Sequence, residues 1–202
     1  MLTITYEGRN SVYVNITNRC PCDCVFCLRH NKDHVFNSSS LWLEREPTVE
    51  EICDSIDAWD LTKYDEIVFC GYGEPTERLD DLLKVAAYVK SKGKVKIRIN
   101  TNGLADLICG EKTAHRLKGL IDCVSISLNA TNEEDYLKSV RPKFGIKSYG
   151  AMLDFAKDCV GYVPEVVMTV VDVVTTKEVQ ERCRKICESL GVTLRVRPYE
   201  EN

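Results

Sequence analysis

The feature that most constrains the fold is a regular alternation of short strand patterns with helix patterns along most of the chain. Alternating or continuous apolar runs predict strands at residues 11–17, 66–70, 95–101, 123–128, 165–173 and 193–197. Patterns of helical period predict helices at residues 48–59, 79–92, 105–120, 132–138, 149–159 and 177–190. This order predicts right-handed crossovers and a parallel sheet with its helices outside, either doubly wound or curled into a full or partial barrel.

The two faces of the expected strands favour the curled form. One side of each middle strand is apolar and the other is polar: Ile97 and Ile99 alternate with Arg98 and Asn100, and Val124 and Ile126 alternate with Ser125 and Ser127. A doubly wound sheet buries both faces and shows continuous apolar runs. A curled sheet, apolar toward its helices and polar toward a wet lumen, explains the pattern better, so we predict a partial barrel of six parallel strands.

Signals at the helix ends support these boundaries, and nothing divides the chain. Thr48 and Glu51 have the spacing of a capping box, and Gly93, Gly161 and Gly191 stand where helix C-caps are wanted. The 202 residues contain no internal repeat, low-complexity tract or linker rich in proline and glycine. We therefore expect a single domain over residues 1–202.

Charge and hydropathy argue against several classes of protein. The 27 basic and 31 acidic side chains give a net charge of −4, which argues against stable binding of nucleic acid. The first residues lack the cationic and apolar regions of a secretory signal. The longest apolar stretch, residues 163–174, is too short and too polar to span a bilayer. We therefore expect a cytoplasmic protein with no membrane partner.

Eleven cysteines are too sparse for a disulfide scaffold, so ligation, catalysis and burial are the remaining uses. Cys20, Cys24 and Cys27 form a CxxxCxxC motif directly after the first strand. Three thiolates on one loop can ligate three irons of a [4Fe-4S] cluster and leave the fourth iron open. The alternative is a zinc knuckle with Cys22 as fourth ligand, although no second CxxC pair is present. The seven other cysteines are most simply small core residues.

Three further segments follow the cysteine motif, each at the end of an expected strand. They are Gly71-Tyr72-Gly73-Glu74-Pro75-Thr76, Asn100-Thr101-Asn102-Gly103 and Ser125-Ile126-Ser127-Leu128-Asn129. With the cysteines, over about residues 11–198, they resemble the radical S-adenosylmethionine (radical SAM) superfamily, and most of all its compact members associated with TatD-type hydrolases. The resemblance implies an α/β fold of the partial (β/α)6 TIM-like barrel type. It also implies that a [4Fe-4S] cluster cleaves S-adenosylmethionine reductively to a 5′-deoxyadenosyl radical, which abstracts hydrogen from a substrate.

The resemblance assigns roles to individual residues, with Cys20, Cys24 and Cys27 as cluster ligands. The residues expected to bind S-adenosylmethionine are Phe26, Gly71, Gly73, Glu74, Asn102, Ser127, Asn129 and Arg141. Glu74 would accept hydrogen bonds from the methionine amino group, the glycines would let the backbone approach the ligand, and Arg141 would pair with the carboxylate. The residues expected to meet the substrate are Arg98, Asn100, Arg195 and Arg197, for whose arginines structural ion pairs are the alternative.

The substrate and partners stay open at this point. If the strand arginines face the lumen, a nucleotide or an anionic metabolite is favoured as substrate. The short chain is also similar to activating enzymes that install glycyl radicals in a partner protein, and a reductant such as flavodoxin or ferredoxin would supply the electron. The alternative from another class is a non-catalytic iron–sulfur or zinc module that senses redox state, for which Cys22 would be the fourth ligand. With 202 residues, we expect specificity to come from the lumen, short loops or a partner.

Overall fold

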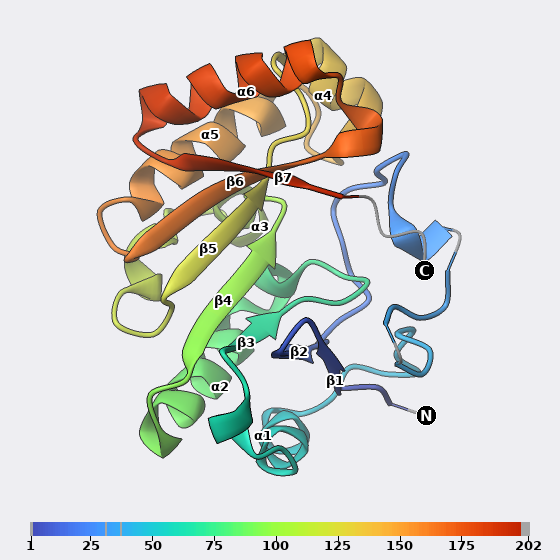
Figure 1. The fold of residues 1–202 in the computed structure, drawn as a ribbon, viewed down its shortest axis with the longest axis vertical. Helices are drawn as coiled ribbons and strands as arrows, with labels where there is room; N and C mark the ends of the chain where they lie inside the picture. Colours follow the sequence, from blue (N-terminus) through green and yellow to red (C-terminus); the bar gives the residue numbers. More distant parts are fainter. Residues whose placement is uncertain (1, 31, 37, 199–202) are drawn as a thin grey trace.

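The computed structural model describes residues 2–30, 32–36 and 38–198, and its centre is a seven-stranded sheet whose strands follow one another in chain order (Figure 1). The strands are β1 (Thr5–Gly8), β2 (Ser11–Val14), β3 (Glu66–Phe69), β4 (Lys96–Thr101), β5 (Cys123–Ser127), β6 (Glu165–Val171) and β7 (Thr193–Arg197). Strands β2 to β7 are parallel, and β1 pairs antiparallel with β2. The predicted α/β fold with six parallel strands is confirmed.

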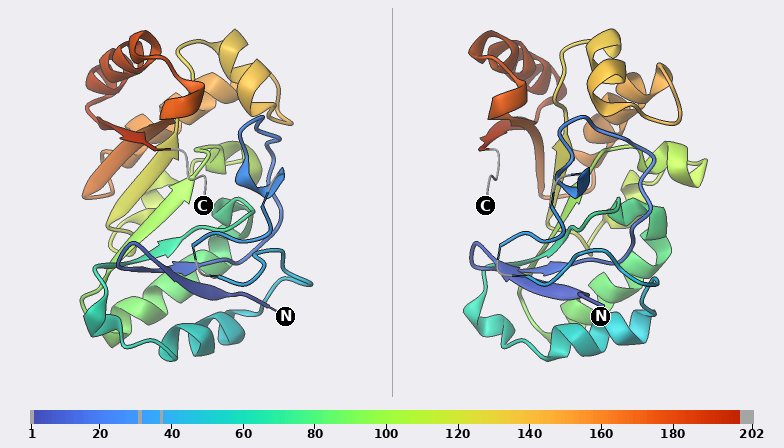
Figure 2. Two further views of the ribbon diagram at one scale, coloured as in Figure 1. Left: turned by 45° about the vertical axis from the view of Figure 1, so that its right-hand side comes forward. Right: turned by 90° about the vertical axis from the view of Figure 1, so that its right-hand side faces the viewer.

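The helices lie on one side of the curved sheet, and the segment between β2 and the first helix lies on the other (Figure 2). The α-helices are α1 (Val49–Asp57), α2 (Leu79–Lys92), α3 (Ala105–Cys109), α4 (Glu133–Val140), α5 (Lys147–Cys159) and α6 (Lys177–Leu190). The short 3-10 helices are η1 (Leu28–His30), η2 (Leu61–Lys63), η3 (Pro75–Arg78), η4 (Ala114–Leu117) and η5 (Asp172–Val174). None of the helices in the described residues has the length and apolar character needed to cross a lipid bilayer.

Hydrophobic side chains form two separate clusters, one on each face of the sheet. The larger one fills the space between the sheet and the helices, where Ile97, Ile126 and Met168 are fully buried. The smaller one lies on the opposite face and consists of Tyr6, Tyr13, Val35, Leu41, Val68 and Tyr72. The prediction of a polar inner face is therefore right for β4 and β5, whereas over β1 to β3 the chain's own residues 35 and 41 cover an apolar surface.

Strand β1 and its turn were missed by the sequence prediction. The turn residues Arg9 and Asn10 have φ values of 46° and 59°, the backbone conformation of the tight turns that suit a twisted hairpin. Tyr6 and Tyr13 face each other across the two strands with their ring centroids 5.1 Å apart. The Arg-Asn pair lacks the glycine that usually marks such a turn, so the signal was weak.

Two predictions about helices were wrong. The helix expected at 105–120 is broken into α3 and η4, because Gly110 ends α3 at a φ of 75° and Asp106 Oδ1 accepts hydrogen bonds from the Thr113 backbone and hydroxyl. Gly93 and Gly191 are the C-cap residues of α2 and α6, as predicted, but Gly161 lies beyond the cap residue of α5. The capping box of α1 and the bounds of α2 and α6 are confirmed.

Candidate active site

Three loops that follow β2, β3 and β4 meet at one end of the sheet, where the carboxyl ends of the parallel strands lie. The backbone nitrogen of Glu74 donates to the Arg19 carbonyl oxygen at 2.7 Å. The backbone nitrogen of Asn102 donates to Glu74 Oε2 at 2.7 Å, and its side-chain amide donates to Cys22 Sγ at 3.6 Å. The cysteine loop, the glycine-rich segment and the Asn-Gly turn predicted from the sequence are therefore in contact.

One thiol of the cysteine loop is buried, and the other three are half-buried. Cys22 is only 4% exposed, whereas Cys20, Cys24 and Cys27 are half-buried. Hydrogen bonds to Cys20 and Cys24, followed by burial, hold the pKa of the Cys22 thiol above its usual range, and the bond from Cys22 lowers the pKa of Cys20. Burial raises the pKa of Cys27. No three Cys, His, Asp or Glu side chains in the described part of the chain gather closely enough to hold a single metal ion.

The loop is held by contacts with the end of α4 that the sequence did not indicate. Asp23 and Val25 donate backbone hydrogen bonds to the carbonyl oxygens of Val140 and Ser139, at 3.1 and 2.9 Å. Lys143 in turn donates to the Pro21 carbonyl oxygen at 2.8 Å. We call this pairing of residues 21–25 with residues 139–143 the strap. The two segments lie far apart in the sequence and carry no shared pattern, so only the fold reveals their contact.

Arg29 is a second contributor that the sequence prediction missed. Its guanidinium donates to the Cys22 carbonyl oxygen at 3.0 Å, and its side chain is 17% exposed. Its charge acts to lower the pKa of Cys20 and Cys27, although hydrogen bonding and burial have larger effects on those two thiols. A basic residue two positions after the last cysteine of the motif was the available signal.

Glu74 is buried and its carboxylate is engaged by neighbouring segments. Oε1 accepts from the Thr76 backbone and hydroxyl at 3.1 and 2.7 Å and from the Thr101 hydroxyl at 2.8 Å, while Oε2 accepts from the Asn102 backbone. Burial raises the pKa of Glu74, and these hydrogen bonds oppose the rise. The carboxylate therefore fixes the start of η3 against the end of β4 and keeps acceptor capacity on Oε2.

Contacts within the chain itself explain why positions 71 and 73 are occupied by glycine. A Cβ on Gly71 would lie 2.0 Å from Asn15 Oδ1, and one on Gly73 would meet the backbone oxygens of Thr17 and Arg19. Their close approach in the structure is thus to the loop that leads from β2 to the cysteines. The expected approach to S-adenosylmethionine stays a prediction.

The other residues expected to bind S-adenosylmethionine surround the same end of the sheet. Ser127 ends β5, and Asn129 follows it at a φ of 52° with its Oδ1 accepting from the Val171 backbone at 3.0 Å. Phe26 is half-buried within the cysteine loop. Arg141 caps α4 in the left-handed conformation, is 57% exposed, and lies 3.7 Å from Asp23 of the cysteine loop. Arg141 is therefore beside the cysteines, on the strap.

Of the four residues expected to meet the substrate, two arginines form ion pairs. Arg98 lies 2.8 Å from Glu66, and Arg195 lies 3.8 Å from Glu165. Arg98 Nε and the side-chain oxygen of Asn100 are nevertheless buried without a hydrogen-bond partner in the described residues. Burial raises the pKa of Cys70, and a hydrogen bond from Asn100 and the charges of Arg197 and Arg98 oppose it. These groups thus lie near one another on the sheet face that carries no helices.

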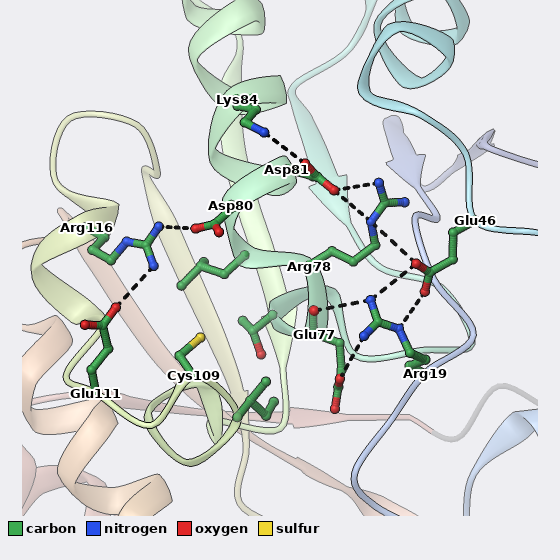
Figure 3. A pocket seen from close by; sticks show the side chains of 13 residues that line it. Arg19, Glu46, Glu77, Arg78, Asp80, Asp81, Lys84, Cys109, Glu111 and Arg116 are labelled. Carbon is green, nitrogen blue, oxygen red and sulfur yellow. Dashed lines mark hydrogen bonds and ion pairs between the residues drawn. The ribbon is translucent and has the colours of Figure 1, made fainter.

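The seven remaining cysteines were expected in the core, and this is right for four of them. The buried ones are Cys123, Cys159, Cys183 and Cys187, and the half-buried ones are Cys53 and Cys70. Cys109 is exposed, because α3 ends there and the expected longer helix does not form. It lines a surface cavity of about 550 Å³, in which Arg19, Arg78 and Arg116 form ion pairs with surrounding acidic side chains (Figure 3).

The residues present fit the cluster that the resemblance implies. Three half-buried thiols of the right spacing are the donor set that an iron–sulfur cluster requires. The hydroxyl of Tyr136 on α4 is buried without a hydrogen-bond partner among the described residues. The charges of Cys22 and Cys24 are among the causes that raise its pKa, so the hydroxyl lies near the cysteine loop. A buried donor that lacks a partner beside the thiols is consistent with a site built for an added group.

Comparison with known proteins identifies the family. The model of the radical SAM superfamily matches residues 14–186. An Fe-coproporphyrin III synthase from Methanosarcina barkeri is 34% identical over 136 residues, 66% of this chain and 30% of the relative. A Methanocaldococcus jannaschii protein named for glycyl-radical enzyme activation is 32% identical over 126 residues, 62% of this chain and 46% of the relative. The chain thus spans less than half the length of these two relatives.

Solved structures share the fold at low identity. A radical SAM methyltransferase from Sphaerobacter thermophilus superposes with a TM-score of 0.67 at 18% identity, covering 96% of this chain and 57% of that one. SuiB of Streptococcus suis, bound to S-adenosylmethionine, gives 0.64 at 15% identity, covering 94% of this chain and 38% of that one. With the family model matching most of its length, the chain belongs to the radical SAM superfamily, whose cofactors are a [4Fe-4S] cluster and S-adenosylmethionine.

Proposed function

We propose that this chain carries a radical SAM enzyme activity, in which Cys20, Cys24 and Cys27 hold a [4Fe-4S] cluster. The bound cluster would pass one electron to the sulfonium of S-adenosylmethionine, and the resulting 5′-deoxyadenosyl radical would abstract hydrogen from a substrate. The electron comes from a reductant such as flavodoxin or ferredoxin. The residues described form one domain in this proposal.

The observation that carries the proposal is the contact among the three loops. The Asn102 backbone nitrogen donates a hydrogen bond to Glu74, and its side-chain amide donates one to Cys22. These two bonds hold the cysteine loop and the glycine-rich segment in a fixed arrangement. A cofactor bound to the open iron would lie beside these residues. Fixed geometry of this kind is what a reaction between two bound groups requires.

Individual residues have distinct tasks in this proposal. Cys22 is the buried thiol of the loop, and it hydrogen-bonds to the neighbouring sulfurs. Glu74 orients the ends of β3 and β4 and offers Oε2 to the methionine amino group. The polar residues at the ends of β4 and β5, Asn102, Ser127 and Asn129, offer hydrogen bonds to the rest of S-adenosylmethionine. Gly71, Gly73 and Phe26 shape the backbone around it, and Arg141 is placed to pair with a carboxylate.

Anaerobic reconstitution of the purified protein tests the cluster assignment. We expect about four irons per chain, an EPR spectrum of the reduced cluster that changes when S-adenosylmethionine is added, and release of 5′-deoxyadenosine. Cys24→Ala should lose the cluster, because the open-iron site has no spare ligand. Exposed Cys109→Ala should keep it, which controls for loss of a thiol.

Cys22→Ala separates the enzyme from the alternative of a closed redox-sensing module. We expect this variant to assemble the cluster, since Cys22 is a hydrogen-bonding neighbour in the proposal. If its iron content falls as far as that of Cys24→Ala, the site has four protein ligands and the enzyme assignment is wrong. Tightly bound zinc without cleavage of S-adenosylmethionine would lead to the same conclusion.

For the substrate we propose an anionic metabolite or nucleotide. Arg197 has no ion-pair partner among the described residues, and Arg98 Nε and the Asn100 side-chain oxygen are buried without partners. Arg195 adds a further positive charge to this region, although its ion pair with Glu165 offsets that charge. Metabolite screening should therefore find anionic compounds, and not neutral ones, among those that increase 5′-deoxyadenosine formation.

A second candidate is activation of a glycyl-radical partner protein, which the Methanocaldococcus jannaschii relative's name favours. In that case a partner protein, and no small anion, would increase 5′-deoxyadenosine formation and would acquire the EPR doublet of a protein-centred radical. The TatD-associated subgroup and a cytoplasmic location remain predictions from the sequence.

A further inference from the structure

Tyr136 is a buried hydrogen-bond donor that has no acceptor among the residues that the structure describes. Its side chain is 1% exposed, and its hydroxyl is buried without a hydrogen-bond partner in the described part of the chain. Buried tyrosine hydroxyls usually find a partner, and a native structure keeps few that do not. A buried hydroxyl without a partner costs folding free energy, so its presence here calls for an explanation.

Tyr136 stands on α4, the helix whose end holds the cysteine loop. Tyr136 lies one helical turn before Val140, whose carbonyl oxygen accepts from the Asp23 backbone in the strap. Its ring packs against that of Tyr149 on α5, with the ring centroids 5.5 Å apart. The ring is therefore packed against a neighbouring helix, and the helix that carries it is attached to the cysteine loop.

The electrostatic surroundings of the hydroxyl also relate it to the cysteine loop. Burial raises the pKa of Tyr136, and negative charge on Cys22, Cys24, Glu74 and Cys20 raises it further. The neutral hydroxyl, with its proton available to donate, is thus the stable form beside these groups. Asn102 is a second donor in the same region, since its side-chain amide reaches Cys22 Sγ.

We propose that the Tyr136 hydroxyl donates a hydrogen bond to a sulfur of the bound [4Fe-4S] cluster or of its cysteine ligands, and thereby makes the cluster easier to reduce. This inference rests on the proposed function, because it needs the cluster. Reduction adds negative charge to the sulfurs, and a donor aimed at them binds the more negative state more strongly. Tyr136 is in this sense a positioning and tuning residue, and it takes no part in the hydrogen abstraction.

Tyr136→Phe tests the inference, because it removes the hydroxyl and leaves the ring that packs on Tyr149. Reduction of the reconstituted protein is titrated by EPR without S-adenosylmethionine. We expect the midpoint potential to become more negative, so that the ratio of reduced to oxidised cluster at a fixed potential falls by roughly three- to tenfold, where tenfold equals about 59 mV for one electron.

Tyr149→Phe is the matched control. It removes the same atom from the neighbouring ring, but burial and then the charges of Cys183, Cys187 and Glu133 raise the pKa of Tyr149 to about 12. The cysteines of the loop are not among these causes, in contrast to Tyr136. We expect its cluster to keep the potential of the unchanged protein.

Two further measurements separate tuning from a general structural effect. In the reduced cluster, an exchangeable proton coupled to the iron–sulfur spin should be seen by ENDOR and should be absent in Tyr136→Phe. In the cluster-free protein, Tyr136→Phe should melt at the same or a higher temperature, because the variant loses only an unpaired hydroxyl. A clear fall in the melting temperature of the cluster-free variant would mean that the hydroxyl already has a partner, and would overturn the inference.

The outcomes also distinguish a failure of the Tyr136 inference from a failure of the proposed function. If the unchanged protein assembles a cluster and cleaves S-adenosylmethionine, but Tyr136→Phe has the same potential and the same proton couplings, the role of Tyr136 is refuted and the proposed function stands. If the unchanged protein assembles no cluster, the proposed function fails and the inference fails with it.

Discussion

Gly73 shows how closely the loops of the site pack at the level of single residues. A Cβ at this position would lie 2.2 Å from the Thr17 carbonyl oxygen and 2.7 Å from that of Arg19. Both atoms belong to backbone that leads into the cysteine motif, so neither can move without moving that motif. The glycine is needed for the fold as well as for any ligand.

Gly73→Ala should therefore destabilise the cluster-free protein by about 1–3 kcal/mol, the usual cost of forcing a group into a packed site. Gly150→Ala is the control, because Gly150 lies inside α5 and, apart from its chain neighbours and the nearby helix backbone, no heavy atom of the described residues lies within 4 Å of the added Cβ. It should stabilise the protein by about 0.5–1 kcal/mol, since alanine favours a helix more than glycine does. Urea unfolding of both variants provides the comparison, and equal effects would contradict the packing argument.

Glu74 illustrates what single residues in a sequence can and cannot tell. Its place after a buried strand and two glycines marked it as a site residue, and the structure does put it among the converging loops. The three donors that surround Oε1 come from Thr76 and Thr101, and the latter lies on another strand. That contact depends on the register of β3 and β4, which no local pattern in the sequence specifies.

At the scale of elements, α1 offers a measurable pH dependence. Hydrogen bonds from Arg45 and from the Thr48 backbone lower the pKa of Glu51 from 4.5 to about 2. A lowered pKa means that the ionised carboxylate stabilises the folded state above pH 4.5, and that this contribution is lost as the pH falls toward 2.

Glu51→Gln should accordingly unfold more easily at pH 7 and lose less stability than the unchanged protein between pH 4.5 and 2. Asp54→Asn on the same helix is the control, as Asp54 is exposed and has no ion-pair partner in the described residues. Denaturant unfolding across this pH range gives the answer. If Glu51→Gln and the unchanged protein lost the same stability between pH 4.5 and 2, the capping box would contribute nothing.

Elements with strong local signals were predicted well, and those that depend on distant contacts were not. The bounds of α2 and α6 follow from long amphipathic patterns, and the capping box fixes the start of α1. Strand β1 needed its pairing with β2 to be recognised, and the break after α3 depends on Asp106 turning back to Thr113. The strap could not be predicted for the same reason, because its two halves are short and far apart in sequence.

For the whole molecule, the important asymmetry lies on the sheet face that carries no helices. Over β1 to β3 that face is covered by the smaller hydrophobic cluster, in which Leu41 is 1% exposed and accepts a hydrogen bond from Asn15 through its carbonyl oxygen. Over β4 to β7 the same face carries polar residues, namely Asn100, Ser125, Arg98, Arg195 and Arg197. Polar ligands are thus directed to one half of the partial barrel.

Leu41→Ala should cost about 2–5 kcal/mol of unfolding free energy, as expected for a fully buried leucine. Leu137→Ala on α4 is the control, because Leu137 is 37% exposed, and it should cost less than about 1 kcal/mol. Chemical denaturation measures both. Similar small losses in the two variants would show that the segment around Leu41 is not packed on the sheet.

The strap also sets an order of events during the protein's synthesis. The cysteines leave the ribosome before the carbonyl groups of Ser139 and Val140 that hold their loop, because these are made only after β5. A nascent chain that ends before α4 therefore presents its thiols on an unsupported loop, exposed to zinc and to oxidants. Delivery of the metal cofactor is in this view a step that follows translation of at least the first five strands and α4.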